Sequence, residues 1–209
     1  MNALPASSGK RMWARSAIII GATAMAGAAA LSIGLTAAGA APAKDHSFSF
    51  KLVPSPGIKA CLPHIGGSAK ITAGDLNDTM TVSVHGLPPG TGLDLFVIQE
   101  PNKPFGLSWY QTDVQTGRSG AGTATVRGVF DSQTFSVVPG TSTPTPTPVH
   151  QTHIGLWFNN PRTPFNLGCE SGASVPVVTP FNGEQHAGIQ VLNTANFAIN
   201  KGPLTHLHR

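Results

Sequence analysis

Six aromatic side chains lie in or beside short proline-containing segments and have the chemistry of a ligand-binding surface. Flat apolar rings stack on ligands, and neighbouring amides fix a ligand's orientation by hydrogen bonding. The six are Phe105, Trp109, Tyr110, Trp157, Phe165 and Phe181, and the amides nearby are Gln111, Asn160, Asn166 and Asn182. If these segments share one end of the fold, they form a platform for a sugar or a peptide.

Trp157 is the strongest single candidate among them. It alternates with apolar residues at 154, 156 and 158, so an extended strand would direct it to the opposite face. Gly155 leaves space on that same face. The competing interpretation is that the Thr/Pro-rich stretch before it covers the ring.

The two longest of these segments read Pro-x-x-Pro-Phe-x-Leu, at 101–107 and 161–167, and a third Pro-Phe occurs at 180–181. Each of the two follows an apolar run. Proline removes a ladder donor and forces its predecessor into extended geometry, so it ends strand pairing. The structural hypothesis is therefore a strand exit whose phenylalanine folds back over the end of the sheet. Ligand binding is the functional alternative.

Histidines offer a weaker case for chemistry. H-x-x-H occurs at His150–His153 and H-x-H at His206–His208, spacings at which two imidazoles can share a metal. Both pairs fall at the edge of a linker or at the chain terminus, where polar residues are common. We predict neither a metal nor another cofactor.

Motifs of the major enzyme classes are missing. The sequence has no G-x-S-x-G, H-E-x-x-H, Walker or dinucleotide-binding motif. We therefore predict a non-enzymatic protein with unknown catalytic residues. The alternative is an extracellular hydrolase that acts on polysaccharide or ester substrates.

Residues 1–43 have the pattern of a signal peptide. Lys10, Arg11 and Arg15 precede an apolar stretch from 16 to 35, and small residues then offer cleavage after Ala40 or Ala43. An uncleaved membrane anchor is the rival interpretation, because the stretch is nearly long enough to span a bilayer. The small residues at the end of the stretch favour cleavage. Cleavage predicts a secreted protein, which either is free or is associated with the cell wall.

Cleavage removes most of the positive charge. The chain has 13 Lys and Arg against 9 Asp and Glu, and loss of the three in the signal leaves 10 against 9, or +1. No Lys/Arg stripe remains to neutralise a phosphate backbone. We expect no nucleic-acid partner, and no membrane association after cleavage.

The two cysteines, Cys61 and Cys169, predict a disulfide, because an even pair in an exported chain is usually oxidised. Two free thiols are the alternative. The absence of C-x-x-C disfavours redox catalysis and a thiolate zinc site.

In the mature sequence, apolar and polar residues alternate with a period of two. In 79–85, apolar Met80, Val82 and Val84 alternate with polar residues. Such alternation places one face on a core and the other in water, as in antiparallel sheets. The segment 93–98 is apolar at both parities after Asp94, which predicts a strand covered on both sides. The same alternation occurs at 68–73, 124–130, 135–137, 154–158 and 189–191.

Glycine, proline, asparagine and aspartate fall between these runs, and no segment beyond the signal has helical spacing. These features predict an all-β fold: one antiparallel, Ig-like β-sandwich over residues 44–209. The Thr/Pro-rich stretch 139–152 interrupts it as an exposed loop, or as a linker whose far side completes the same sheets.

Residues 80–91, "MTVSVHGLPPGT", and 116–128, "TGRSGAGTATVRG", resemble the Ig-like and superoxide-dismutase-like sandwiches of exported bacterial proteins. The resemblance covers 69–130 and implies the fold. Dismutases carry H-x-H on the next strand, where this chain reads "LDLFV" at 93–97, so the metal ligands are not carried over.

The segments 96–113, 153–161 and 180–194 together also resemble a group of exported proteins of unknown function from high-GC bacteria such as actinobacteria. This resemblance implies no activity. The sequence therefore predicts a secreted or cell-surface β-sandwich that recognises a cell-wall glycan or another extracellular ligand through aromatic loops.

Overall fold

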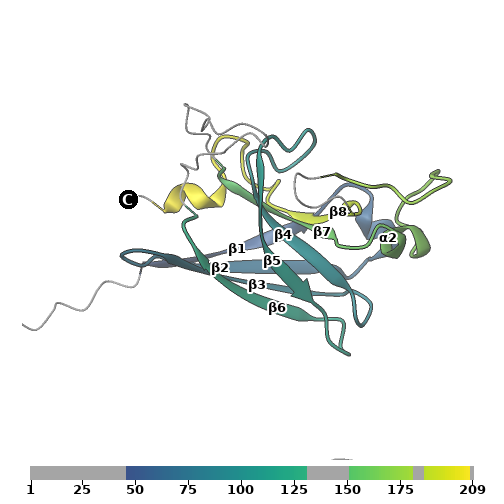
Figure 1. The fold of residues 1–209 in the computed structure, drawn as a ribbon, viewed down its shortest axis with the longest axis horizontal. Helices are drawn as coiled ribbons and strands as arrows, with labels where there is room; N and C mark the ends of the chain where they lie inside the picture. The colour runs from purple at the N-terminus through teal and green to yellow at the C-terminus, as the bar shows by residue number, and fades with distance from the viewer. Residues whose placement is uncertain (1–45, 131–150, 181–185, 208–209) are drawn as a thin grey trace, which may run out of the picture. The chain divides into compact units, whose positions relative to one another are not determined.

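A computed structural model describes residues 46–130, 151–180 and 186–207 (Figure 1). Within them, eight strands form one antiparallel sheet in the order β5-β4-β7-β8-β1-β2-β3-β6. The strands are β1 (Ser47–Pro54), β2 (Gly66–Thr72), β3 (Asp78–His85), β4 (Gly92–Ile98), β5 (Ser108–Gln115), β6 (Gly122–Gly128), β7 (His153–Phe158) and β8 (Gln190–Asn193).

The sheet is nearly closed. Its two ends, β5 and β6, are joined by a tight turn in which the Gly117 N–H donates to the Ala121 carbonyl at 2.8 Å. At the opposite side, β1 serves both halves of the sheet: its residues 47–52 pair with β2, whereas Val53 and Pro54 pair with β8. Figure 1 shows β2, β3 and β6 side by side with β4 and β5 crossing them.

Alternation in the sequence appears directly in the burial of the strands. In β3, Met80, Val82 and Val84 are buried and face an inner core, while the threonines and serine between them are partly exposed. The predicted all-β, antiparallel fold is confirmed at this level. The predicted strand at 135–137 lies outside the described residues.

β4 is covered on both faces, as predicted from the apolar residues at both odd and even positions of its sequence. Leu93, Leu95 and Val97 belong to the inner core, whereas Phe96 and Ile98 belong to a separate cluster on the other face. We call this second set of buried residues the outer cluster. It consists of Phe96, Ile98, Phe105, Trp157 and Ala187.

The expectation of no helix was wrong in a minor way. Three single-turn helices occur in connections: α1 (Ile58–Cys61), α2 (Arg162–Asn166) and the 3-10 helix η1 (Pro203–His206). Each has only four or five residues, too few to show helical periodicity in the sequence. None of the helices in the described residues has the length and apolar character needed to span a bilayer.

The predicted disulfide is confirmed. Cys61, the last residue of α1, is bonded to Cys169, three residues after α2, with 5.1 Å between the two Cα atoms. The bond spans 108 residues. It therefore ties the segment that follows β7 to the segment that follows β1.

Candidate ligand pocket

The first Pro-x-x-Pro-Phe-x-Leu segment forms most of the connection between β4 and β5, which we call the Phe105 loop (residues 99–107). Backbone hydrogen bonds close it, from the Gln99 N–H to the Leu107 carbonyl and from the Glu100 N–H to the Phe105 carbonyl, each 2.9 Å. Phe105 has φ of 67°, in the left-handed region that non-glycine residues rarely adopt. The loop therefore fixes Phe105 in a conformation that surrounding contacts must maintain.

Those contacts lie on the outer face of the sheet. The Phe105 ring packs edge-on against Trp157, with centroids 5.0 Å apart, and Trp157 packs in the same way against Phe96 at 5.4 Å. Phe105 is only 8% exposed. Its ring thus closes the outer cluster, as the strand-exit hypothesis predicts for this segment.

Trp157 does not lie on an accessible surface, contrary to the sequence interpretation. It is fully buried, and the space left by Gly155 is filled by its own ring: a Cβ at Gly155 would lie 2.6 Å from Cζ3 of Trp157. The parity argument correctly separated Trp157 from the inner core. The cover comes from Phe105, a contact that the sequence pattern does not reveal.

A buried polar network connects the Phe105 loop to β8. The Ser55 hydroxyl donates to Oε1 of Gln190 at 2.8 Å, and Nδ2 of Asn193 donates to the same oxygen at 2.8 Å. Nε2 of Gln190 in turn donates to the Pro101 carbonyl at 3.1 Å. Because both ends of the Gln190 amide are bonded, the network holds the start of the loop against the sheet.

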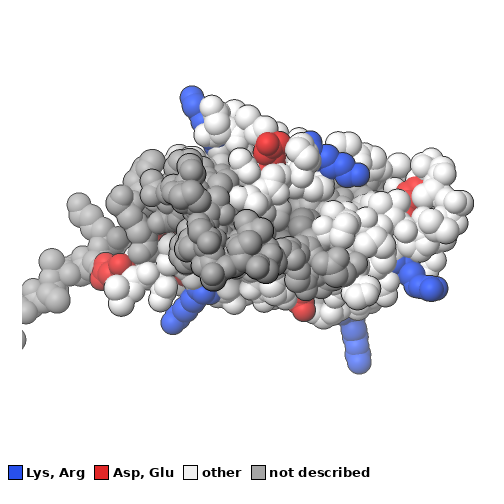
Figure 2. All heavy atoms as spheres, turned by 45° about the horizontal axis from the view of Figure 1, so that its top comes forward, with Lys and Arg blue, Asp and Glu red and all other residues white. Residues whose placement is uncertain are grey.

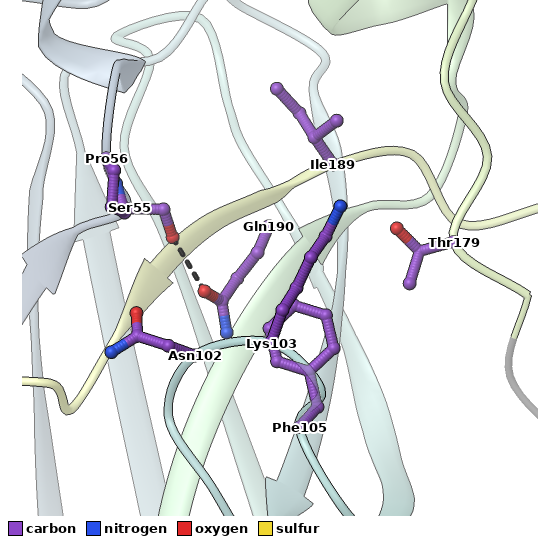
Figure 3. Close-up of a pocket in the computed structure, with 8 residues that line it drawn as sticks. All are labelled: Ser55, Pro56, Asn102, Lys103, Phe105, Thr179, Ile189 and Gln190. Carbon is purple, nitrogen blue, oxygen red and sulfur yellow. Dashed lines mark hydrogen bonds between the residues drawn. The ribbon is translucent and has the colours of Figure 1, made fainter.

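A pocket of about 480 Å³ opens beside this network (Figure 3). Its volume falls in the range of small-molecule sites. The Phe105 ring, Ile189 and Pro56 provide apolar lining, and the polar side chains come from three separate connections and from β8. The lining residues are Ser55, Pro56, Asn102, Lys103, Phe105, Thr179, Ile189 and Gln190.

Among the residues that the structure describes, a single cation dominates the electrostatics of the pocket: Lys103 is the one charged residue of its described lining. Figure 2 shows Lys, Arg, Asp and Glu side chains scattered among uncharged residues on the face drawn there. Because salt screens exposed charges beyond about 10 Å, dispersed surface charges contribute less at the pocket than Lys103 does.

The other sequence candidates that the structure describes do not line this pocket. Trp109 and Tyr110 are 49% and 44% exposed on β5, but their register partners are Val97 and Phe96, which face opposite sides of the sheet. Since paired residues share a face, the two rings point apart and form no common platform. Phe165 is half-buried in α2, and Phe181 lies outside the described residues.

The described histidine of the H-x-x-H pair, His153, has a structural role. His153 is fully buried: Nδ1 lies 2.9 Å from the Thr194 hydroxyl and Nε2 lies 3.0 Å from the Ile199 carbonyl. Burial lowers the pKa of His153 below its usual value, because the charged imidazolium is poorly solvated there. Both ring nitrogens are engaged, and His150 and His208 lie outside the described residues.

Sequence reasoning missed most of the pocket. Gln190 and Asn193 offered the one usable signal, because they are polar residues within an apolar run at 187–194. A buried amide needs hydrogen-bond partners, so this run indicates a polar network. Lys103, Thr179 and Ser55 carry no such signal.

The chain matches no protein-family model and no curated protein sequence. Its function must therefore be argued from the pocket.

Proposed function

We propose that this protein is an exported, non-enzymatic binding protein that recognises a cell-wall or extracellular ligand, and that the ligand occupies the pocket beside the Phe105 loop. The observation that carries the proposal is a cavity of about 480 Å³ with apolar lining and a few polar groups. This combination is typical of sites that bind small molecules by burying them.

The rigidity of the pocket supports binding. Phe105, which lines it, is held by Trp157 on one side and by loop hydrogen bonds on the other. Gln190 is held at both ends of its amide. A site whose lining residues are fixed before the ligand arrives loses less conformational entropy on binding.

The chemistry of Ser55 favours binding over hydrolysis at this place. Its hydroxyl donates to Gln190 and accepts from Nδ2 of Asn193. A serine nucleophile needs a neighbouring base that removes its proton, and an amide has no basic site of that kind. The described residues also contain no group of three or more His, Cys, Asp and Glu side chains placed to hold a metal ion.

Export is proposed from the signal-like residues 1–43 and from the disulfide, which is consistent with an oxidising, extracellular location. We further propose that the nearly closed sheet is organised as an Ig-like β-sandwich. One layer would hold β1, β2, β3 and β6, and the other β8, β7, β4 and β5. An inner core that draws side chains from both sets of strands supports this arrangement.

The neutral dye N-phenyl-1-naphthylamine tests the pocket, because its fluorescence increases in an apolar site. We expect the purified mature protein to bind the dye. Thr179→Phe should reduce the affinity at least roughly tenfold, because a ring at this lining position fills the cavity. Thr125→Phe, at an exposed position of β6, should bind like the wild type. Equal binding by all three proteins would refute the assignment.

A further inference from the structure

We propose that the pocket selects ligands that join an apolar body to an anionic group, and that Lys103 binds the anion. This inference rests on the proposed function, because it assigns a ligand class to the same pocket. Three features of the lining carry it: the charge of Lys103, the Thr179 hydroxyl near it, and the position of the Phe105 ring.

Lys103 brings a positive charge to the pocket. It lies in the exposed tip of the Phe105 loop, and none of the described residues that line the cavity is acidic. Within the part of the chain that the structure describes, Lys103 has no ion pair. A ligand anion would therefore not have to displace a carboxylate of the described residues before it binds this cation.

The direction of the Lys103 side chain indicates where the anion would lie. Figure 3 shows it extending along the pocket, with its ammonium on the side of Ile189 and Thr179. The Thr179 hydroxyl lines the same side and has no hydrogen bond to another described residue. An anionic oxygen placed there can accept from both groups, and hydrogen bonds between charged groups are the stronger kind.

Two polar side chains on the opposite side of the pocket, Ser55 and Gln190, already have hydrogen-bond partners. Ser55 and Gln190 are bonded to each other (Figure 3), and Nε2 of Gln190 donates to the Pro101 carbonyl. These groups have little remaining capacity for a charged ligand. The anion is thus favoured at the end where the Lys103 ammonium lies.

The lining between the two ends selects against a bare inorganic anion. The Phe105 ring and Ile189 both face the cavity, and covering them with an apolar group removes apolar surface from water. A phosphate or sulfate ion would leave this surface uncovered. The matching class is an amphipathic anion, such as an aromatic or medium-chain acid.

Two dyes with one skeleton test this class. 1-Anilinonaphthalene-8-sulfonate is N-phenyl-1-naphthylamine with an added sulfonate, so their affinities differ mainly by the anion. We expect the sulfonate dye to bind roughly tenfold more tightly at low salt, and the difference to shrink as salt is added. Lys103→Met, which keeps an apolar stem but removes the charge, should abolish the difference in affinity between the two dyes.

Lys70→Met is the matched control, because Lys70 is an exposed lysine on β2 and does not line the pocket. It should retain the full preference for the sulfonate dye. If both dyes bind equally to the wild type, or if Lys103→Met keeps the preference, the assignment of an anion site is wrong while the proposed pocket stands. If neither dye binds in a manner sensitive to Thr179→Phe, the proposed function itself fails.

Discussion

The two Pro-x-x-Pro-Phe-x-Leu segments share four residue identities and differ in structure. In 101–107 the chain makes a tight loop, and Phe105 adopts φ of 67° and is buried against Trp157. In 161–167 it forms the single-turn helix α2, and Phe165 is half-buried. Both segments end a strand, but they place their phenylalanines in different environments.

The two segments differ in structure because the chain continues to different places after each of them. After β4 the chain returns at once to pair with it as β5, so the loop must reverse direction within the nine residues 99–107. After β7 it instead runs to Cys169, which is fixed by the disulfide, and reaches β8 only later. A short motif thus specifies where strand pairing stops, while long-range constraints decide the conformation that follows.

Removing the disulfide should give the largest effect on stability, and under native conditions local opening should increase mainly in the α2 segment. Replacing Cys61 and Cys169 together with alanine should lower the free energy of unfolding by about 4 kcal/mol, the order expected for a loop that spans 108 residues. Urea denaturation measures the loss. Hydrogen exchange should then be faster at the backbone amides of residues 167 and 169, which bond within the α2 segment.

The Phe105 loop supplies the internal control for that experiment. Its Glu100 and Phe105 amides are bonded within the loop, far along the chain from either cysteine. Under native conditions their exchange should change much less than that of the α2 segment. Equal loss of protection in both segments would show that the two are not independently anchored.

Truncating the two phenylalanines compares the segments directly. Phe105→Ala should cost about 3 kcal/mol of stability, because it removes a buried ring from the outer cluster. Phe165→Ala should cost about 1 kcal/mol, since the ring is already half in water. Urea midpoints provide both values, and near-UV circular dichroism should report altered packing at Trp157 only for Phe105→Ala. Equal costs would contradict the different burial of the two rings.

The sequence predicted those features of the fold that depend on local pattern. Burial of β4 on both faces followed from apolar residues at both parities, and the strand exits followed from proline at 101 and 161. The disulfide followed from an even pair of cysteines. Each of these inferences needs only the residues concerned and their immediate neighbours.

The pocket could not be predicted in the same way, because its residues meet only through the fold. Ser55 and Gln190 are 135 residues apart, and Ser55 and Asn193 are 138 apart. Trp157 shows the same limit. Its position in the alternating pattern predicted the correct face of the sheet. Its burial, however, depends on Phe105, which lies in the connection between β4 and β5.

Filling the space beside Trp157 should disturb the Phe105 loop and leave α2 intact. In Gly155→Ala the new Cβ would lie 2.6 Å from Cζ3 of Trp157 and 2.8 Å from Nε2 of Gln190, so one of them must shift. Such overpacking should cost about 2 kcal/mol and weaken dye binding. Gly117→Ala is the control, because its Cβ would meet nothing closer than 3.8 Å and stability should change by less than about 0.5 kcal/mol.

The smallest expected effect comes from replacing each phenylalanine with glycine or with alanine. The stabilities of these two variants should rank in opposite order at positions 105 and 165. At residue 105, φ of 67° disfavours any side chain, so Phe105→Gly should be more stable than Phe105→Ala by about 1 kcal/mol. At residue 165, inside α2, Phe165→Gly should be less stable than Phe165→Ala by up to about 1 kcal/mol. Because each comparison is made between two truncated variants, loss of the ring cancels. The same ranking at both positions would mean that the two segments share a backbone conformation, and the contrast between them would be lost.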